Sequence, residues 1–211
     1  MIIGLDFDNT IVSYDSLFHK VALEQAVIPE TTLVNKIAVR NHLRNVNKES
    51  IWTVMQGYVY GERMQEAQPY EGVIEFIILA KQLGHTLFIV SHKTKYPFLG
   101  PKYDLHLSAI KWIENYLSNA GQPLFSRNEY FFEITKEEKV QRIKSSGCDM
   151  YIDDLPEILL HKHFPPNCKK ILFDPEKHYI DENFEGLTIA NSWPQIYDLL
   201  LKYKCLDGSN T

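Results

Sequence analysis

The sequence has few cysteines and no long apolar run. Its 211 residues include three cysteines, at wide and irregular spacing, without a CxxC pair or a Cys/His cluster. This scarcity argues against a zinc site or a disulfide framework and favours reduced thiols. No apolar stretch approaches the roughly 20 residues that a membrane helix needs. The start, Met1 to Asp6, has no basic region and predicts a first strand rather than a signal peptide. We therefore expect a cytoplasmic protein.

The chain also lacks an excess of positive charge. Lysine and arginine number 22 against 27 acidic residues, a net charge of −5. This balance argues against a nucleic-acid or anionic-membrane surface, because both require a basic face. Hydrophobic residues make up 45% of the chain, which is ordinary for a globular protein, and the length allows one core with a small insertion. We therefore expect no nucleic-acid or membrane partner, whereas the oligomeric state is undetermined by the sequence.

Short apolar runs alternate with amphipathic segments along most of the chain, and this pattern is typical of a parallel α/β sheet. The predicted fold is therefore a Rossmann-like parallel sheet with flanking helices. The predicted strands are Ile2–Leu5, Thr86–Val90, Tyr130–Phe132, Met150–Ile152, Lys170–Phe173 and Leu187–Ala190. Helical periodicity predicts helices over about 73–83, 105–117 and 194–203, and a capping box at 135–138 predicts the start of another.

One interval breaks the alternation. The first and second predicted strands are separated by nearly three times the roughly 30 residues of a βαβ crossover. The excess predicts three helices, near Asp15–Val27, Thr32–Asn45 and Ser50–Met64. We interpret residues 14–68 as an inserted helical cap on an α/β core of residues 1–13 and 69–205. Residues 206–211 are expected to form a frayed tail.

Two carboxylates and a hydroxyl follow the first predicted strand, in Asp6-Phe7-Asp8-Asn9-Thr10. Alternate residues of a strand share a side, so Asp6, Asp8 and Thr10 converge at the carboxyl edge of the sheet, where α/β proteins bind ligands. Crowded carboxylates repel unless a cation or a shared proton compensates. The alternative is an ordinary turn, which Asp and Asn often form after a strand.

The second predicted strand ends in Ser91-His92-Lys93-Thr94. Ser91 can donate a hydrogen bond to a phosphoryl oxygen, and the backbone amides that follow can add further donors; alternatively, the serine only caps the loop. Lys93 can bind a second anionic group of a substrate. A solvated basic loop is the competing interpretation.

A third motif, the acidic pair Asp153-Asp154, ends a later apolar strand. Adjacent carboxylates at that place are costly without a metal, and oxygen ligands favour a hard cation such as Mg²⁺. Lys139, on the helix that begins near 135, can reach the same edge as a point charge for phosphate. The rival cations on that helix are Lys136, Arg142 and Lys144.

These motifs in this order resemble the haloacid dehalogenase superfamily, and the surrounding α/β pattern extends the resemblance over the whole chain. The resemblance implies that Asp6 is the nucleophile and Asp8 the general acid/base. It implies that the phosphate ligands are Thr10, Ser91, His92 and Lys139. It also implies that Mg²⁺ is held by the Asp6 side chain, the Asp8 carbonyl and Asp154, with Asp153 assisting directly or through water.

The implied activity is that of a Mg²⁺-dependent phosphomonoesterase that forms an aspartyl phosphate and acts on a small phosphorylated metabolite of the sugar-phosphate or nucleotide class. Dehalogenases of the superfamily lack the second aspartate, so Asp8 favours phosphate chemistry. Candidate substrate contacts in the cap are Tyr58, Tyr60 and Arg63, together with Trp52 and Gln56. The same covalent intermediate also suits a phosphotransferase or phosphomutase, and a non-catalytic adaptor is a further alternative. A receiver domain fits less well, because it has no helical insertion.

Overall fold

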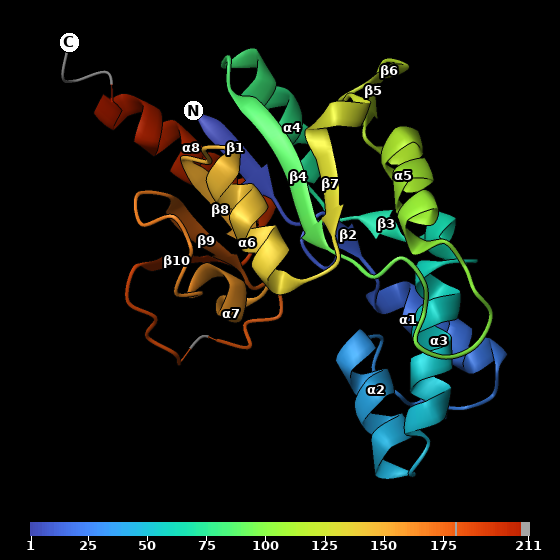
Figure 1. Ribbon diagram of the computed structural model, residues 1–211. Coiled ribbons are helices and arrows are strands. Elements are labelled where there is room, and N and C mark those ends of the chain that lie inside the picture. The colour runs from blue at the N-terminus through green and yellow to red at the C-terminus, as the bar shows by residue number, and fades with distance from the viewer. Residues whose placement is uncertain (180, 208–211) are drawn as a thin grey trace.

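The computed structural model describes residues 1–179 and 181–207, and its centre is a parallel sheet (Figure 1). The strands are β1 (Ile2–Leu5), β4 (Thr86–His92), β7 (Tyr130–Glu133), β8 (Met150–Asp153), β9 (Lys169–Phe173) and β10 (Leu187–Ala190). Their order is β10-β9-β8-β1-β4-β7, and all neighbours pair in parallel. Every predicted strand is confirmed, and the first strand of the chain lies inside the sheet.

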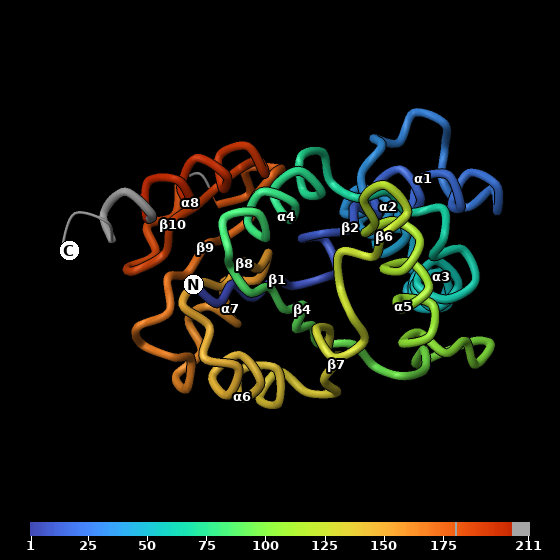
Figure 2. Tube along the Cα trace, turned by 90° about the horizontal axis from the view of Figure 1, so that it is seen from above, coloured from blue at the N-terminus to red at the C-terminus, as the bar shows by residue number. Residues whose placement is uncertain are grey.

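Helices cover both faces of this sheet (Figure 2). One face carries α4 (Val73–Gln82) and α8 (Trp193–Asp207), and the other carries α6 (Lys136–Ser145) and α7 (Pro156–Leu159). Helix α5 (Leu105–Tyr116) lies beyond the β7 edge. The predicted α/β class is therefore correct. Within the described residues, no helix combines the length and the apolar character that crossing a bilayer requires.

Side-chain alternation in the strands divides the core between the two faces. Ile3 and Leu5 of β1 belong to the apolar cluster that includes residues of α4 and α8. Tyr151 of β8 belongs to the other cluster, with residues of α6 and α7. Its ring crosses Gly4, where an added Cβ would lie 2.4 Å from the Tyr151 Cδ2. The Tyr151 hydroxyl donates to the carbonyl of Val90 at 2.5 Å, so β1 needs a glycine at this point to let the ring reach β4.

The predicted capping box is present at the start of α6. The Thr135 side chain accepts from the Glu138 amide, and the Glu138 carboxylate accepts from the Thr135 amide. This reciprocal cap places Lys139 in the first turn of the helix. At the other end of the chain, α8 runs to Asp207, two residues beyond the predicted end of the core. The rest of the predicted tail, 208–211, lies outside the described residues.

The long interval between β1 and β4 contains a helical insertion, which lies beyond the carboxyl edge of the sheet (Figure 1). Its helices are α1 (Asp15–Glu24), α2 (Lys36–Asn45), α3 (Glu49–Tyr60) and the short 3₁₀ helix η1 (Met64–Glu66). It leaves and returns through an antiparallel pair, β2 (Val12–Ser13) and β3 (Gln68–Pro69). The predicted boundary at 68/69 falls within β3, and the one at 13/14 comes directly after β2.

All three α-helices of the insertion are shorter than predicted, and α1 ends at Glu24 rather than near Val27. Helix α2 begins at Lys36 rather than near Thr32, because the Asn35 side chain accepts from the Ala38 amide and caps the helix there. Helix α3 ends at Tyr60, and Gly61 follows as its C-cap. A further small pair, β5 (Ser118–Asn119) with β6 (Gln122–Pro123), and the 3₁₀ helix η2 (Arg127–Glu129) lie between α5 and β7.

Candidate active site

The register of the sheet brings the predicted acidic motifs together. Leu5 of β1 is level with Ile89 of β4 and with Ile152 of β8. The next residue of each strand therefore reaches the same height at the carboxyl edge, which places Asp6 beside Asp153 although 147 positions separate them in the sequence. Sequence-distant groups meet here because the strands are parallel and central.

Lys139 joins the first and third motifs through two ion pairs. Its Nζ lies 2.7 Å from Oδ1 of Asp6 and 2.6 Å from Oδ2 of Asp153, and all three side chains are buried. Burial opposes the ammonium charge, but Asp153 and Asp6 outweigh it, so the pKa of Lys139 is raised. Of the four cations considered on this helix, Lys136 and Arg142 form ion pairs with Glu157 and Glu133 instead.

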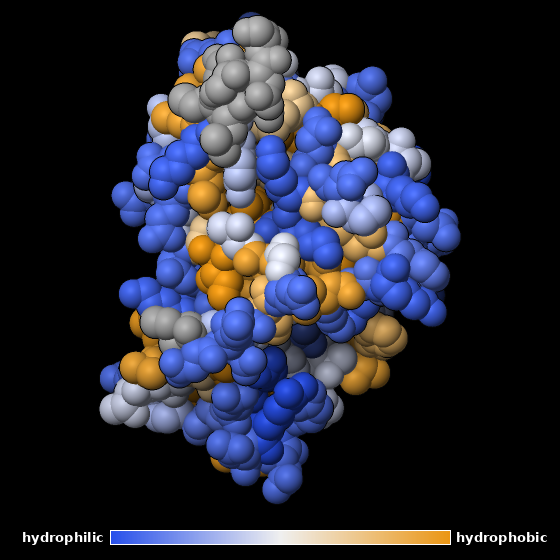
Figure 3. Space-filling model, turned by 90° about the vertical axis from the view of Figure 1, so that its left-hand side faces the viewer, coloured by the Kyte–Doolittle hydropathy of each residue, from blue (hydrophilic) through white to orange (hydrophobic). Residues whose placement is uncertain are grey.

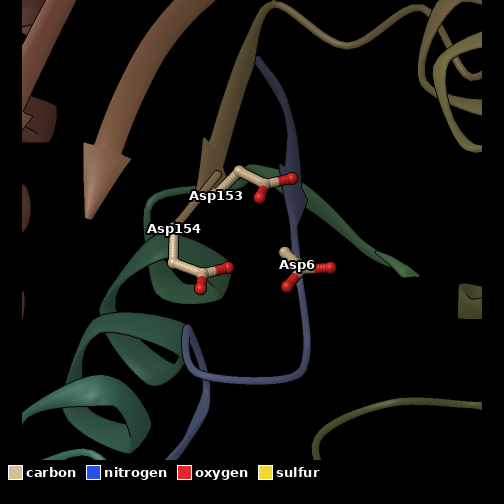
Figure 4. Close-up of side chains that lie close together, drawn as sticks. All are labelled: Asp6, Asp153 and Asp154. Carbon is tan, nitrogen blue, oxygen red and sulfur yellow. The ribbon is translucent and has the colours of Figure 1, made fainter. Parts of the chain in front are cut away.

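Asp6, Asp153 and Asp154 surround one small space (Figure 4). Each offers a carboxylate oxygen, and these oxygens lie within 4.8 Å of one another. Burial and the neighbouring carboxylates raise the pKa of Asp154 well above its ordinary value. Lys139 and the more distant Lys36 of α2 do not balance three carboxylates, so a divalent cation fits the charge of this site. An all-oxygen donor set suits a hard ion.

Asp8, two residues after Asp6, lies at the same carboxyl edge of the sheet, and two side chains bind its carboxylate. Lys93 Nζ lies 2.9 Å from Oδ1 and 2.8 Å from Oδ2 of Asp8, and the Tyr14 hydroxyl donates to Oδ1 at 2.5 Å. Burial raises the pKa of Asp8, but the charge and hydrogen bonds of Lys93, aided by Tyr14, hold it below the ordinary value. Asp8 is therefore a carboxylate in this arrangement.

Lys93 thus occupies a different place from the one its loop position suggests. Its side chain is only 3% exposed, so the solvated-loop interpretation is wrong for this residue. The His106 ring is bonded to the Lys93 carbonyl at 2.7 Å, which fixes the start of the loop. Because Lys93 already balances Asp8, a role in binding a second anion is a prediction that this arrangement does not favour.

A lysine of the insertion enters the site, and sequence reasoning missed it. Lys36, the first residue of α2, places its Nζ 3.1 Å from Oδ1 of Asn9, and the Asn9 amide reaches Oδ2 of Asp154 at 3.4 Å. The ammonium lies 5.6 to 5.9 Å from the ring centres of Tyr14, Phe18 and Tyr60. Asn9 has a φ of 58°, a left-handed conformation that asparagine tolerates. No local pattern in the sequence marks Lys36, because only tertiary folding brings α2 to Asn9.

The other predicted phosphate ligands take varied positions. Ser91 is buried in β4, level with Phe132 of β7. The Thr10 hydroxyl is buried, and within the described residues it has no hydrogen-bond partner. The His92 ring, in contrast, is bonded to the Ile134 carbonyl at 2.9 Å. Their roles toward phosphate stay predictions.

The predicted substrate contacts of the insertion divide into two groups. Tyr60 packs edge-on against Tyr14, and the Lys93 ammonium lies 5.0 Å from its ring centre, so Tyr60 borders the Asp8 network. Arg63 instead forms ion pairs with Glu24 and Glu66. The Arg63 guanidinium also lies 5.7 Å from the ring of Tyr58. Their roles toward substrate also stay predictions.

A cleft of about 290 Å³ opens from Asp154 between the core and α2. Its core side includes Tyr70, Phe173 and the loop 174–179, and its insertion side includes Lys36 and Arg40. In Figure 3 the surface is recessed between the core above and the largely hydrophilic insertion below. The cleft adjoins the carboxylate cluster and has room for a small molecule.

Comparisons with known proteins identify the fold. No family model and no curated protein matches the sequence. Among solved structures, the chain resembles a haloacid dehalogenase-like hydrolase from Burkholderia xenovorans, at 12% identity and a TM-score of 0.56, covering 96% of this chain and 97% of that one. A hydrolase of the same kind from Xanthomonas campestris is 9% identical, with a TM-score of 0.56 over 100% and 98% of the two chains.

A third structure, a HAD hydrolase from Bacillus subtilis bound to magnesium, is 13% identical with a TM-score of 0.52 and covers 94% of this chain and 97% of that one. The matches extend over nearly the whole length of each protein, although identity is low. Together with the parallel sheet and the insertion after β1, they show that this chain has the fold of the haloacid dehalogenase superfamily.

Proposed function

We propose that the protein is a Mg²⁺-dependent phosphomonoesterase that acts on a small phosphorylated metabolite. The observation that carries the proposal is the cluster of Asp6, Asp153 and Asp154 with Lys139 bonded to two of them. Three carboxylates around one space suit a divalent cation, and a buried lysine beside a candidate nucleophile suits the charge of a phosphoryl group. Structures of this fold include hydrolases, which agrees with the proposal.

Asp6 is the proposed nucleophile. One of its carboxylate oxygens forms a bond to phosphorus while the bond from phosphorus to the leaving oxygen breaks, which gives an aspartyl phosphate and an alcohol. Lys139 balances negative charge on Asp6 and on the phosphoryl oxygens. Bound Mg²⁺, held by Asp6, Asp154 and Asp153 with the Asp8 carbonyl, would supply further neutralisation of that charge.

Asp8 is the proposed proton carrier. As the alcohol leaves, the carboxyl group of Asp8 gives its proton to the leaving oxygen, and it then takes a proton from the water that hydrolyses the aspartyl phosphate. In the present arrangement Lys93 favours the carboxylate form. A phosphate dianion placed next to Asp8 acts in the opposite direction, because a like charge favours the neutral acid.

The test is release of inorganic phosphate from an aryl phosphate. We expect turnover in Mg²⁺ and none after chelation with EDTA. Asp6→Asn should lower turnover more than about 1,000-fold, because it removes the nucleophile and preserves shape. The matched control is Asp198→Asn, which makes the same change at an exposed position of α8 and should leave turnover unchanged. Turnover by Asp6→Asn equal to that of the unmodified protein would refute the mechanism.

The same preparation tests the transferase alternative. Adding glycerol or another alcohol as acceptor shows whether phosphate passes to water or to the alcohol. A hydrolase releases inorganic phosphate in equal amount to the phenol. If the acceptor takes most of the phosphate at millimolar concentration, the protein is a phosphotransferase and the hydrolase assignment is wrong.

A further inference from the structure

The cleft between the core and α2 contains several charged groups, and its acidic groups are already bonded within the protein. Asp15 accepts from the Lys36 backbone amide at 2.7 Å. Asp174 accepts from the backbone amides of His178 and Tyr179, both at 2.9 Å. Glu176 accepts from the Asn35 side chain. These three carboxylates are therefore bonded to backbone and amide groups of the cleft wall and not to the side-chain cations Lys36 and Arg40.

The two cations of the cleft are less completely compensated. Lys36 Nζ bonds to the Asn9 amide oxygen and to the Tyr60 hydroxyl, and the charges of Asp154 and Asp8 act on it without an ion pair to either carboxylate. Among the described residues, Arg40 has one side-chain hydrogen-bond partner, the side-chain oxygen of the adjacent Asn41, at 3.3 Å. Across the part of the chain that the structure describes, neither forms a salt bridge with a carboxylate.

The helix gives these two cations a fixed spacing. Residues four apart on a helix share a face, and their positions differ by about 6 Å along its axis. Lys36 lies at the Asn9 end, close to Asp154, and Arg40 lies one turn further from the acidic cluster. An extended ligand whose phosphoryl group lies at Asp6 would therefore pass these cations in the cleft.

We propose that Lys36 and Arg40 form a subsite for a second anionic group on the substrate, a carboxylate or a phosphate carried by the leaving group. The inference rests on the proposed phosphatase activity and narrows its substrate class. Lys93 and Arg63 do not compete for this role, because Asp8 balances the first and Glu24 with Glu66 the second. Charge-assisted hydrogen bonds from Lys36 and Arg40 to a partly desolvated anion would favour substrates with a second anionic group over substrates without one.

The experiment compares substrates that differ only in the second group. One pair is 3-phosphoglycerate against glycerol 3-phosphate, and the other is propane-1,3-diol bisphosphate against its monophosphate. For the better pair we expect kcat/KM to favour the substrate that carries the second anionic group roughly 10- to 100-fold, as hydrogen bonds to a charged group allow. The pair with the larger ratio identifies the anion.

The variants locate the effect. Arg40→Gln and Lys36→Gln should each lower the ratio at least fivefold, and Arg40→Lys should retain more of it than Arg40→Gln. The matched control is Arg44→Gln, one turn further along α2, where the guanidinium pairs with Glu49 at the surface. This control should leave the ratio unchanged. Circular dichroism and thermal unfolding of each variant separate loss of binding from loss of fold.

Two results would overturn the subsite. One is a ratio near one for both pairs in the unmodified protein, and the other is a large ratio that neither Arg40→Gln nor Lys36→Gln changes. Both leave the phosphatase assignment intact, because aryl phosphate is still hydrolysed in an Asp6-dependent way. If no phosphate ester is hydrolysed, the proposed function itself fails.

Discussion

At the scale of single residues, the site is governed by a balance of buried charge. Two lysines, Lys139 and Lys93, each approach a carboxylate of the Asp6–Asp8 motif within 3 Å. The first lies between two candidate metal ligands, and the second holds the candidate proton carrier. Burying a charge without a partner is costly, so each lysine makes the adjacent carboxylate tolerable in the interior.

Removing one partner of the Asp8–Lys93 pair should therefore cost more than removing both. We expect Lys93→Met to lower the free energy of unfolding by about 2 to 4 kcal/mol, somewhat less than for a fully buried pair because Asp8 is partly exposed. The double variant Lys93→Met with Asp8→Asn should have a free energy of unfolding at least about 1 kcal/mol higher than that of Lys93→Met alone. Urea unfolding of the four proteins of this cycle measures the coupling. Additive effects of the two changes would show that the pair contributes nothing.

The candidate site could be predicted from sequence where its residues follow predicted strands or, like Lys139, lie in the first turn of a helix with a local start signal. Asp6, Ser91 and Asp153 each end an apolar run, so their meeting at one edge follows from parallel pairing. Tyr14 and Lys36 carry no such signal, because tertiary packing alone brings them to Asp8 and Asn9. The same reason explains Lys93, whose loop position suggested exposure and whose ammonium is buried against Asp8.

At the scale of elements, the sheet was predictable and the details of the insertion were not. Buried parallel strands are continuous apolar runs, and the capping box before Lys136 is a local signal. The start of α2 depends on a choice between Thr32 and Asn35 as cap, and the structure selects Asn35. Strand order also has no local signal, because it is set by which helix packs on which face.

A second contact between the insertion and the core involves α3. The loop that follows β4 packs on this helix at Gly57 and Gly61, where an added Cβ would lie 2.6 Å from Pro97 Cβ and 2.3 Å from Tyr103 Cβ. Both glycines thus lie where the backbone of α3 meets the loop. The loop begins at Lys93, so α3 also supports the residue that holds Asp8.

This contact predicts that Gly57→Ala destabilises the protein, whereas helix propensity alone would predict that it stabilises it. In an isolated helix Gly57→Ala would add about 1 kcal/mol of stability. Here we expect it to lower the free energy of unfolding by about 1 kcal/mol, since overpacking costs about 1 to 3 kcal/mol and the Pro97 ring must move. Ser50→Ala, at an exposed position of the same helix, should change it by less than about 0.5 kcal/mol. Stabilisation by Gly57→Ala, measured by urea unfolding, would contradict the packing.

At the scale of the whole molecule, the proposed metal site would couple cation binding to folding. Asp6 belongs to the start of the chain and Asp153-Asp154 to a strand far along it, so the donor set exists only when the sheet is formed. A cation that binds the folded chain and not the unfolded one stabilises it by mass action. Repulsion among the three carboxylates correspondingly lowers the stability of the metal-free protein.

Thermal unfolding should reveal both the stabilisation by Mg²⁺ and the repulsion among the three carboxylates in its absence. At a Mg²⁺ concentration of 100 times Kd the added stability is about 2.7 kcal/mol, which for a chain of this length raises Tm by about 5 to 11 °C. Asp154→Asn should abolish most of this rise. In EDTA the same variant should melt no lower than the unmodified protein, because one of three mutually repelling carboxylates has been neutralised.

NaCl at equal ionic strength and Asp198→Asn are the controls for unspecific salt effects and for loss of an exposed carboxylate. An undiminished Mg²⁺ shift in Asp154→Asn would place the cation elsewhere, and a lower Tm of that variant in EDTA would show that Asp154 stabilises the metal-free fold.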